Sequence, residues 1–243
     1  MNTHMPELIV ALDVSDSGKL PDILQTIPPP IRFGKIGLEL FCAEGPSSLA
    51  PLREQDWRIF LDLKLHDIPR TVERAVRSAG RHGVDLITVH AAGGTAMLQA
   101  ASEAAGEFGE DRPRLIAVTT LTSLNRQDLE SVGVQRNLGD QATALADLAV
   151  SAGIDGVVTS VHEAEMLRKH LGPKPLLVTP GIRMPGTAAE DQKRIATPAD
   201  AVAAGATHLV VGRPIVGAHD RAVAAETILA SMRTETQQQG NGE

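Results

Sequence analysis

Short apolar runs recur along the chain, and a turn and a helical pattern follow each of them. The runs cover residues 8–12, 31–36, 58–63, 85–89, 115–118, 155–158, 176–178 and 208–211. They are rich in Val, Ile and Leu without regular polar alternation, which is typical of parallel strands covered on both faces. The pattern therefore predicts eight buried strands, each followed by a helix.

Two of the intervening segments, 69–82 and 140–152, show the helical pattern clearly. Apolar residues fall at i, i+3, i+4 and i+7 in both segments, as Val72, Ala75, Val76 and Ala79 and as Ala142, Leu145, Ala146 and Ala149. Pro69 suits the first turn of a helix, where a missing N–H costs nothing. Such small residues let helices pack closely against a barrel.

Strand–helix units of about 30 residues, repeated eight times, predict an α/β fold, the (β/α)₈ TIM barrel. An open doubly wound sheet is the alternative, but the first turn, 13–16, has no G-x-G-x-x-G pattern. No linker is visible, so we expect residues 1–243 to form one domain with its core at about 8–232. The polar tail, 234–243, is expected to fray.

Composition excludes several classes of protein. The chain has 23 Lys and Arg against 30 Asp and Glu, a net charge of −7, with four Phe, one Trp and no Tyr, so we expect no nucleic-acid partner. The single cysteine, Cys42, excludes an internal disulfide framework, and no apolar run reaches the length of a membrane span. Because residues 1–6 lack signal-peptide features, we expect a soluble cytoplasmic protein without a membrane partner.

Charged residues interrupt the third strand near its end, where the active site of a barrel lies. Asp62 and Lys64 are two residues apart and should share one face of the strand, while Leu61, Leu63 and Leu65 point to the other. A charged pair that faces a barrel interior is costly unless it is paired or functional. Both interpretations, an active site and a buried ion pair that plugs the mouth, remain open from the pattern alone.

Three further charges lie at strand ends. Lys35 sits inside an apolar run, which indicates either an inward cation or a lysine reaching the rim. Asp13 follows the first strand and would alone be an ordinary turn residue. Asp67 precedes Pro69 and suits a helix N-cap at least as well as catalysis.

The last two strands end in candidate phosphate ligands. Gly212 permits close approach of the backbone and Arg213 supplies a fork of donors, although a plain tight turn is the alternative. Arg183 follows the seventh strand, and the loop 184–194 is a candidate lid that includes Gln192 as a possible donor. Cations converging on one mouth of an acidic chain favour a small anionic ligand over a polyanion.

These residues resemble the orotidine 5′-phosphate decarboxylase family over about 8–232. The most specific part is the D-x-K-x-x-D signature at Asp62, Lys64 and Asp67. Further matches follow in the family's order: VALD ending at Asp13, KIGLELF from Lys35, LTS at 121–123, TPGIR at 179–183, DQKRIATP at 191–198 and VVGRPI at 210–215. One departure is Arg70, where the family commonly has Asn.

The resemblance implies an enzyme that decarboxylates orotidine 5′-monophosphate to UMP and CO₂, the last step of de novo UMP biosynthesis, without a metal or other cofactor. It implies that Lys64 protonates C6 of the pyrimidine while Asp62 sits beside the scissile carboxylate. Lys35 and Asp67 would complete a Lys-Asp-Lys-Asp array, with Asp67 supplied by the other subunit of a homodimer.

The resemblance also implies a set of substrate contacts. The ribose would be bound by Asp13 and Lys35 with Thr71 from the partner, the base or its closing loop by Thr122 and Ser123, and the phosphate by Arg183, Gln192, Gly212 and Arg213.

Two other functions compete with this one. A 3-keto-gulonate 6-phosphate decarboxylase or hexulose phosphate synthase shares the D-x-K-x-x-D barrel but uses a metal ion, and the strings LTS, TPGIR and DQKRI favour the pyrimidine enzyme over it. A non-catalytic barrel that binds a nucleotide or sugar phosphate is the other alternative. The charged mouth argues against it, because stability alone would favour apolar replacements.

Overall fold

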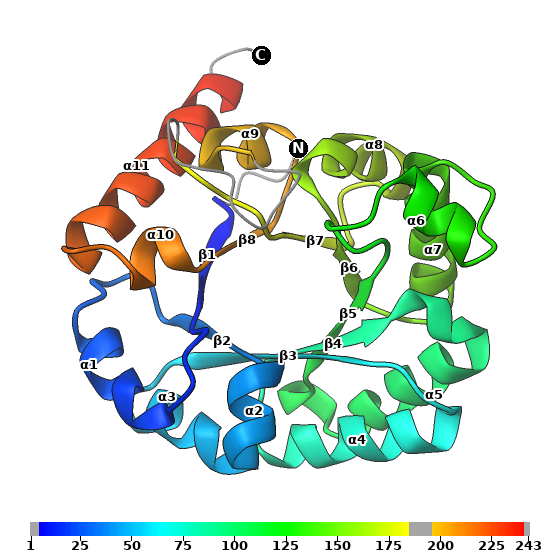
Figure 1. Ribbon diagram of the computed structural model, residues 1–243, viewed down its shortest axis with the longest axis horizontal. Helices are drawn as coiled ribbons and strands as arrows, with labels where there is room; N and C mark the ends of the chain where they lie inside the picture. The colour runs from blue at the N-terminus through cyan, green and yellow to red at the C-terminus, as the bar shows by residue number, and fades with distance from the viewer. Residues whose placement is uncertain (1–4, 185–195, 241–243) are drawn as a thin grey trace.

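Eight parallel strands close into a barrel in the computed structural model, which describes residues 5–184 and 196–240, with side chains up to 233 (Figure 1). The strands are β1 (Glu7–Ala11), β2 (Phe33–Gly37), β3 (Arg58–Leu65), β4 (Leu86–His90), β5 (Arg114–Val118), β6 (Gly156–Val158), β7 (Leu176–Thr179) and β8 (His208–Val211). Each pairs with the next, and β8 pairs with β1 through Leu8 and Leu209. The predicted (β/α)₈ barrel is confirmed, and the open sheet is wrong.

Helices form a ring around the strands (Figure 1). They are α1 (Leu20–Gln25), α2 (Leu38–Glu44), α3 (Ala50–Glu54), α4 (Pro69–Arg81), α5 (Gly94–Gly106), α6 (Arg126–Ser131), α7 (Leu138–Ser151), α8 (Val161–Leu171), α9 (Pro198–Ala203), α10 (Arg213–Val216) and α11 (Arg221–Gly240). Within the described ranges, no helix combines the length and the apolar character needed to cross a membrane.

The two helices with the clearest pattern form close to where they are predicted. α4 begins at Pro69 and buries Val72 and Val76. α7 begins two residues earlier than its apolar stripe indicates, because the Asn137 side chain accepts a hydrogen bond from the backbone N–H of Asp140 at 2.8 Å. An N-cap of this kind satisfies a free donor of the first turn and so sets the start of the helix.

The last helix differs from the expectation of a frayed tail. α11 remains helical to Gly240, well past Thr234 where the polar composition predicts fraying. Glu and Gln are good helix formers, so a polar segment that follows a docked helix can continue it.

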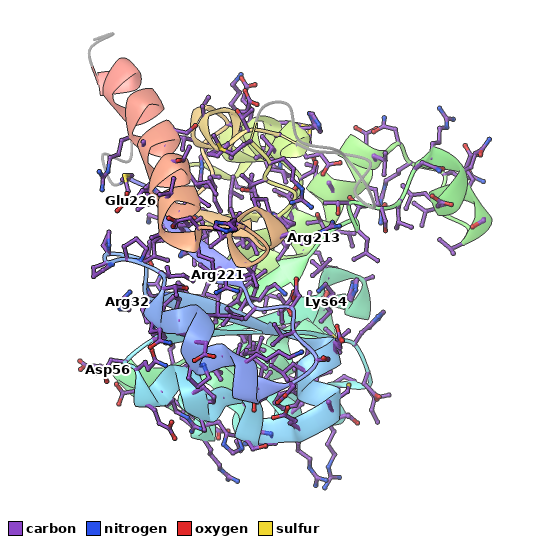
Figure 2. All side chains as sticks on the ribbon, turned by 60° about the vertical axis from the view of Figure 1, so that its left-hand side comes forward. Arg32, Asp56, Lys64, Arg213, Arg221 and Glu226 are labelled. Atoms are coloured by element: carbon purple, nitrogen blue, oxygen red, sulfur yellow. The ribbon has the colours of Figure 1, made fainter. Side chains whose placement is uncertain are left out.

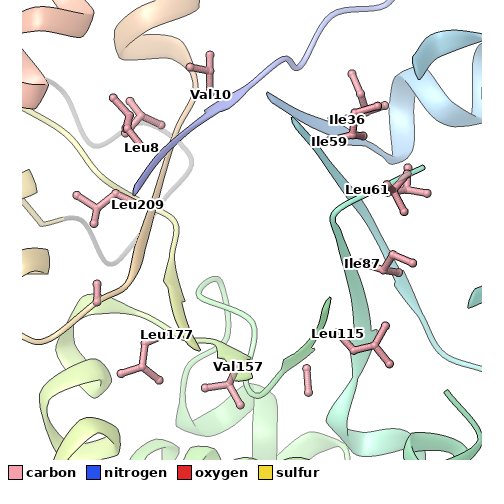
Figure 3. Packing of buried hydrophobic residues seen from close by; sticks show 14 of the residues in the cluster. Leu8, Val10, Ile36, Ile59, Leu61, Ile87, Leu115, Val157, Leu177 and Leu209 are labelled. Carbon is pink, nitrogen blue, oxygen red and sulfur yellow. The ribbon is translucent and has the colours of Figure 1, made fainter. Parts of the chain in front are cut away.

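Apolar side chains pack on both sides of the strands, as the continuous apolar runs predict. Leu8, Leu61 and Leu209 belong to the layer between strands and helices, and Figure 3 shows them pointing outward. Their neighbours in the sequence point the other way, and Ile9 and Phe60, next to Leu8 and Leu61, fill the interior of the barrel. The interior is therefore a packed core below a polar mouth, the usual arrangement of this architecture.

Candidate active site

Four charged side chains form a continuous chain of contacts at the carboxyl ends of β1, β2 and β3. Lys35 Nζ lies 2.9 Å from Asp13 Oδ1 and 3.6 Å from Asp62 Oδ2, and Lys64 Nζ lies 2.8 Å from Asp62 Oδ1. We call this set, Asp13, Lys35, Asp62 and Lys64, the charged array. It lines a cavity of about 170 Å³ that also touches Gly37.

Lys35 is the inward cation that its place in an apolar run indicates. Only 8% of the residue is exposed, and its ammonium bridges two carboxylates. The rim alternative is therefore wrong for this lysine.

Asp62 and Lys64 come together through an irregular strand. The register of β3 against β4 shifts between Leu61 and Leu65, and Lys64 has a left-handed backbone with φ of 51°. The simple alternation of a regular strand, which predicts a shared face, is thus not the geometry that brings the pair together. Left-handed backbone at a residue with a side chain costs about 1–3 kcal/mol and is concentrated at functional sites.

Asp62 is held in its ionised form. Burial by itself would raise the pKa of this carboxyl, but attraction to the ammonium groups of Lys35 and Lys64 outweighs burial, so the pKa lies below its ordinary value. Hydrogen bonds from Lys64 and from the hydroxyl of Thr88 act in the same direction. The centre of the array is therefore a carboxylate between two cations.

β4 contributes two further residues: Thr88, which sequence reasoning missed, and His90, which sequence reasoning interprets as a structural histidine. Thr88 and His90 interrupt the apolar strand at alternate positions, the same signal that identifies Lys35. The ring of His90 lies 5.3 Å from that of His66, which follows β3. Burial lowers the pKa of His90, and the nearby His66 and Lys64 lower it further, so this imidazole is neutral at pH 7.

Asp67 and Thr71 lie outside the charged array of their own chain. The Asp67 carboxylate is exposed and accepts a hydrogen bond from the N–H of Ile68 at 2.6 Å. The N-cap of α4 is Ile68, so the alternative that Asp67 caps the helix is wrong. Thr71 is exposed in the first turn of α4, as is Arg70.

The described candidate phosphate ligands follow the last two strands of the barrel, β7 and β8. Gly212 is the N-cap of α10, and a Cβ added there would lie 3.3 Å from Ala11 Cβ and 3.6 Å from Asp13 Oδ2. Figure 2 shows Arg213 on the same side of the molecule as Lys64, opposite Arg32 and Asp56.

Arg183 follows β7. Its guanidinium donates to the carbonyl of Ile182 at 2.9 Å, beside the bridge between Ile182 and Ala196. Gln192 and nearly all of the predicted lid, 184–194, lie outside the described residues.

The loop after β5 carries the remaining predicted residues. Thr122 is half-buried and Ser123 is exposed. Thr120, two residues before Thr122, is 4% exposed. Its hydroxyl has no hydrogen-bond partner among the described residues. A buried hydroxyl without a partner costs about 1–3 kcal/mol, so it is a candidate for a ligand contact that the sequence analysis missed.

The charged array leaves little scope for a metal among its carboxylates. Asp13 and Asp62 each contact an ammonium group already. In the part of the chain that the structure describes, no three His, Cys, Asp or Glu side chains are grouped so that they could hold a metal ion.

Most of the sequence matches one known protein family. The family described as Orotidine 5'-phosphate decarboxylase / HUMPS matches residues 6–228, which include every predicted site residue. The chain belongs to the orotidine 5′-phosphate decarboxylase / HUMPS family. The resemblance found in the sequence motifs is thereby confirmed.

Curated relatives and solved structures of the orotidine 5′-phosphate decarboxylase / HUMPS family agree with this assignment. The chain is similar to proteins named orotidine 5'-phosphate decarboxylase from Legionella pneumophila, at 46% identity over 88% of this chain and 93% of the relative, and from Moorella thermoacetica, at 45% identity over 93% and 92%. A crystal structure of orotidine 5'-phosphate decarboxylase from Lactobacillus acidophilus superposes with a TM-score of 0.83, at 36% identity over 93% of this chain and 99% of the other.

Proposed function

We propose that this protein is a lyase that decarboxylates orotidine 5′-monophosphate (OMP) to UMP and CO₂, the last step of de novo UMP biosynthesis. The observation that carries the proposal is the charged array at the barrel mouth. Loss of CO₂ leaves an electron pair in the plane of the pyrimidine ring, where resonance stabilises it little. The site must therefore supply positive charge and a proton at one carbon, C6.

Lys64 is the residue that we assign as proton donor. Its ammonium lies 2.8 Å from Asp62 Oδ1, and this contact fixes the direction of the side chain. As the bond between C6 and the carboxylate breaks, the electron pair left on C6 takes a proton from Lys64. The products are CO₂, UMP and a neutral amine that regains its proton from solvent.

Asp62 is assigned to the position beside the scissile carboxylate. Because the flanking cations lower its pKa, Asp62 is charged at neutral pH and repels the substrate carboxylate until CO₂ departs. Lys35 completes the array from β2 and holds Asp13 at the same time. Asp13 and Lys35 would then bind the ribose hydroxyls.

The far end of the substrate would be held by groups from the second half of the chain. We assign Arg183, Gln192, Gly212 and Arg213 to the phosphate and Thr122 and Ser123 to the base or its closing loop. The pairing of β7, β8 and β1 supports this assignment, because it places the strand ends beside Asp13. Binding energy from a phosphate remote from C6 would orient the reacting carbon.

We propose that the site is completed in a homodimer by Asp67 and Thr71 of the other subunit. The loop that carries them supports this, because Ile68 leaves 66% of its surface exposed between them. Leu38, at the rim of the cavity, is 51% exposed. Contact with another subunit would bury both of these exposed apolar side chains.

We also propose that the reaction needs no metal or organic cofactor. The ammonium group of Lys35 lies between Asp13 and Asp62, where a cation would bind, and the ammonium group of Lys64 contacts Asp62 as well. These groups supply both the positive charge and the proton that the reaction requires.

The experiment that tests the function follows the absorbance of OMP after addition of enzyme, with and without EDTA. Loss of OMP absorbance at the same rate in both reactions supports the proposal. Activity that disappears in EDTA would contradict the metal-free reaction and favour the sugar-phosphate enzymes of the superfamily. Binding of OMP without any spectral change would indicate a non-catalytic binding protein.

A further inference from the structure

Thr88 links two residues of the charged array through one buried hydroxyl. The side chain is fully buried on β4, and its Oγ1 accepts a hydrogen bond from the backbone N–H of Lys64 at 2.8 Å. The same oxygen donates to Asp62 Oδ1 at 2.9 Å. Because a backbone N–H can only donate, the hydroxyl proton is left for the carboxylate, and both directions are fixed.

The link lies where β3 departs from regular geometry. The register against β4 shifts between Leu61 and Leu65, and the left-handed residue in this interval is Lys64. The hydroxyl of Thr88 therefore binds the backbone of a strained residue and the carboxylate that its own ammonium contacts. Thr88 thus holds the backbone of Lys64 directly and holds its ammonium group through Asp62.

We propose that Thr88 is a positioning residue, whose hydroxyl holds the Asp62 carboxylate and the backbone of Lys64 in the arrangement that proton delivery requires. The catalytic meaning of this role rests on the proposed function. Thr88 acts through its two neighbours and is not assigned a contact with substrate. Other charged or titratable groups near Asp62 are Lys35 from β2, Lys64 from β3, and His90 with its neighbour His66.

A purely structural role predicts a different outcome. Removing any buried, hydrogen-bonded hydroxyl destabilises a protein. A loss of stability in Thr88→Val is therefore expected for a positioning role and for a purely structural role alike. The proposal requires a change in the titration of Asp62 and in kcat. It also requires that Thr88→Ser, which keeps the hydroxyl, restores both.

The experiment compares Thr88→Val, Thr88→Ser and the control Thr159→Val in the full-length protein. Thr159 is also fully buried, and its hydroxyl donates to Glu163 Oε2 at 3.2 Å, away from the charged array. The Asp62 carboxyl is titrated by NMR in protein with ¹³C-labelled aspartate, and kcat and KM are measured with OMP. Should Thr88→Val fail to fold, Thr88→Cys, with a weak donor and acceptor, replaces it.

We expect Thr88→Val to raise the pKa of Asp62 and to lower kcat about 10- to 100-fold, with a smaller change in KM. Thr88→Ser and Thr159→Val should titrate and turn over as the wild type does. Equal losses in the Val and Ser variants, or an unchanged Asp62 titration and kcat in Thr88→Val, would overturn the proposal. Because the titration needs no substrate, it also tests the role of Thr88 if OMP is not decarboxylated.

Discussion

Both ends of the barrel carry charged networks, but the networks differ in burial and backbone geometry. At the carboxyl end, the side chains of Lys35 and Asp62 are 10% and 13% exposed, next to an irregular part of β3. At the amino end, Arg58 binds Glu7 and Asp85 with 46% of its side chain exposed, from a strand position in regular register. The buried pair of Lys35 and Asp62 beside an irregular strand therefore distinguishes the charged array from the exposed network of Arg58.

Two aromatic rings, those of Phe33 and His208, pack at the amino end of the barrel. Phe33 at the start of β2 lies under the guanidinium of Arg58, 4.2 Å from it, and meets the ring of His208 edge-on. Burial lowers the pKa of His208 to about 4, so its ring is neutral at pH 7. Around Arg58, the amino end thus combines exposed ion pairs with a neutral buried ring, whereas the charged array holds Lys35 and Asp62 in buried positions.

The largest expected effect separates the two ends by activity. Lys64→Ala should lower kcat at least about 10³-fold, because it removes both the proton donor and a cation at C6. Binding of UMP, measured by calorimetry, should remain within about tenfold of wild type because the phosphate ligands are intact. Arg58→Met is the matched control at the amino end and should keep wild-type kcat. Near-normal turnover in Lys64→Ala would remove Lys64 from its role.

The second expected effect tests whether the carboxyl end is complete within one chain. Lys64→Ala and Asp67→Ala should each be inactive alone. Mixed under conditions of proven subunit exchange, they should recover about a quarter of wild-type activity, because half of the dimers are hybrids with one intact site. No recovery despite exchange would contradict the shared site.

The third expected effect is a pH dependence of stability that arises at the amino end. Because the folded-state pKa of His208 is below the unfolded value, folding favours the neutral ring, and stability is lost as the pH falls from about 6.5 toward 4. The loss is at most about 3 kcal/mol in the free energy of unfolding. Urea unfolding at pH 7.5 and 5, followed by Trp57 fluorescence, should show a smaller difference between the two pH values in His208→Gln than in wild type. An equal difference in both proteins would refute this contribution.

The smallest expected effect concerns the exposed ion pairs. Arg58→Met should lower the free energy of unfolding by about 1 kcal/mol or less at pH 7.5, because the pairs with Glu7 and Asp85 are exposed to solvent. Urea unfolding measures this change. A cost of several kcal/mol would show that the amino end is as tightly coupled as the charged array.

The sequence predicts the fold well because each strand coincides with a continuous apolar run of its own. Continuous runs of Val, Ile and Leu report burial on two faces, and the structure places a strand at each predicted run. Boundaries differ by a few residues where capping decides them, as Asn137 does for α7. The backbone of α11 continues past Thr234, where the Glu and Gln residues of the sequence have a helix propensity that polarity alone does not reveal.

The candidate site is predicted in part. Lys35 and Asp62 are found because a charge inside an apolar run is costly to bury unless it is paired or functional. Thr88 gives the same signal more weakly, since a threonine is common in strands, and its two hydrogen bonds depend on tertiary structure. The positive φ of Lys64 has no local sequence signal, because it results from the shifted pairing of β3 with β4.

The pairing of β8 with β1 has a consequence for the synthesis of the chain. All four residues of the charged array lie within the first 64 positions, whereas β8 begins at His208. During translation, the cations and carboxylates leave the ribosome long before β1 gains its second neighbour. Until then, β1 and the newest strand both present open edges that can pair with another chain. The edge of β1 in the nascent protein is therefore covered only once the last strand has emerged and paired with it.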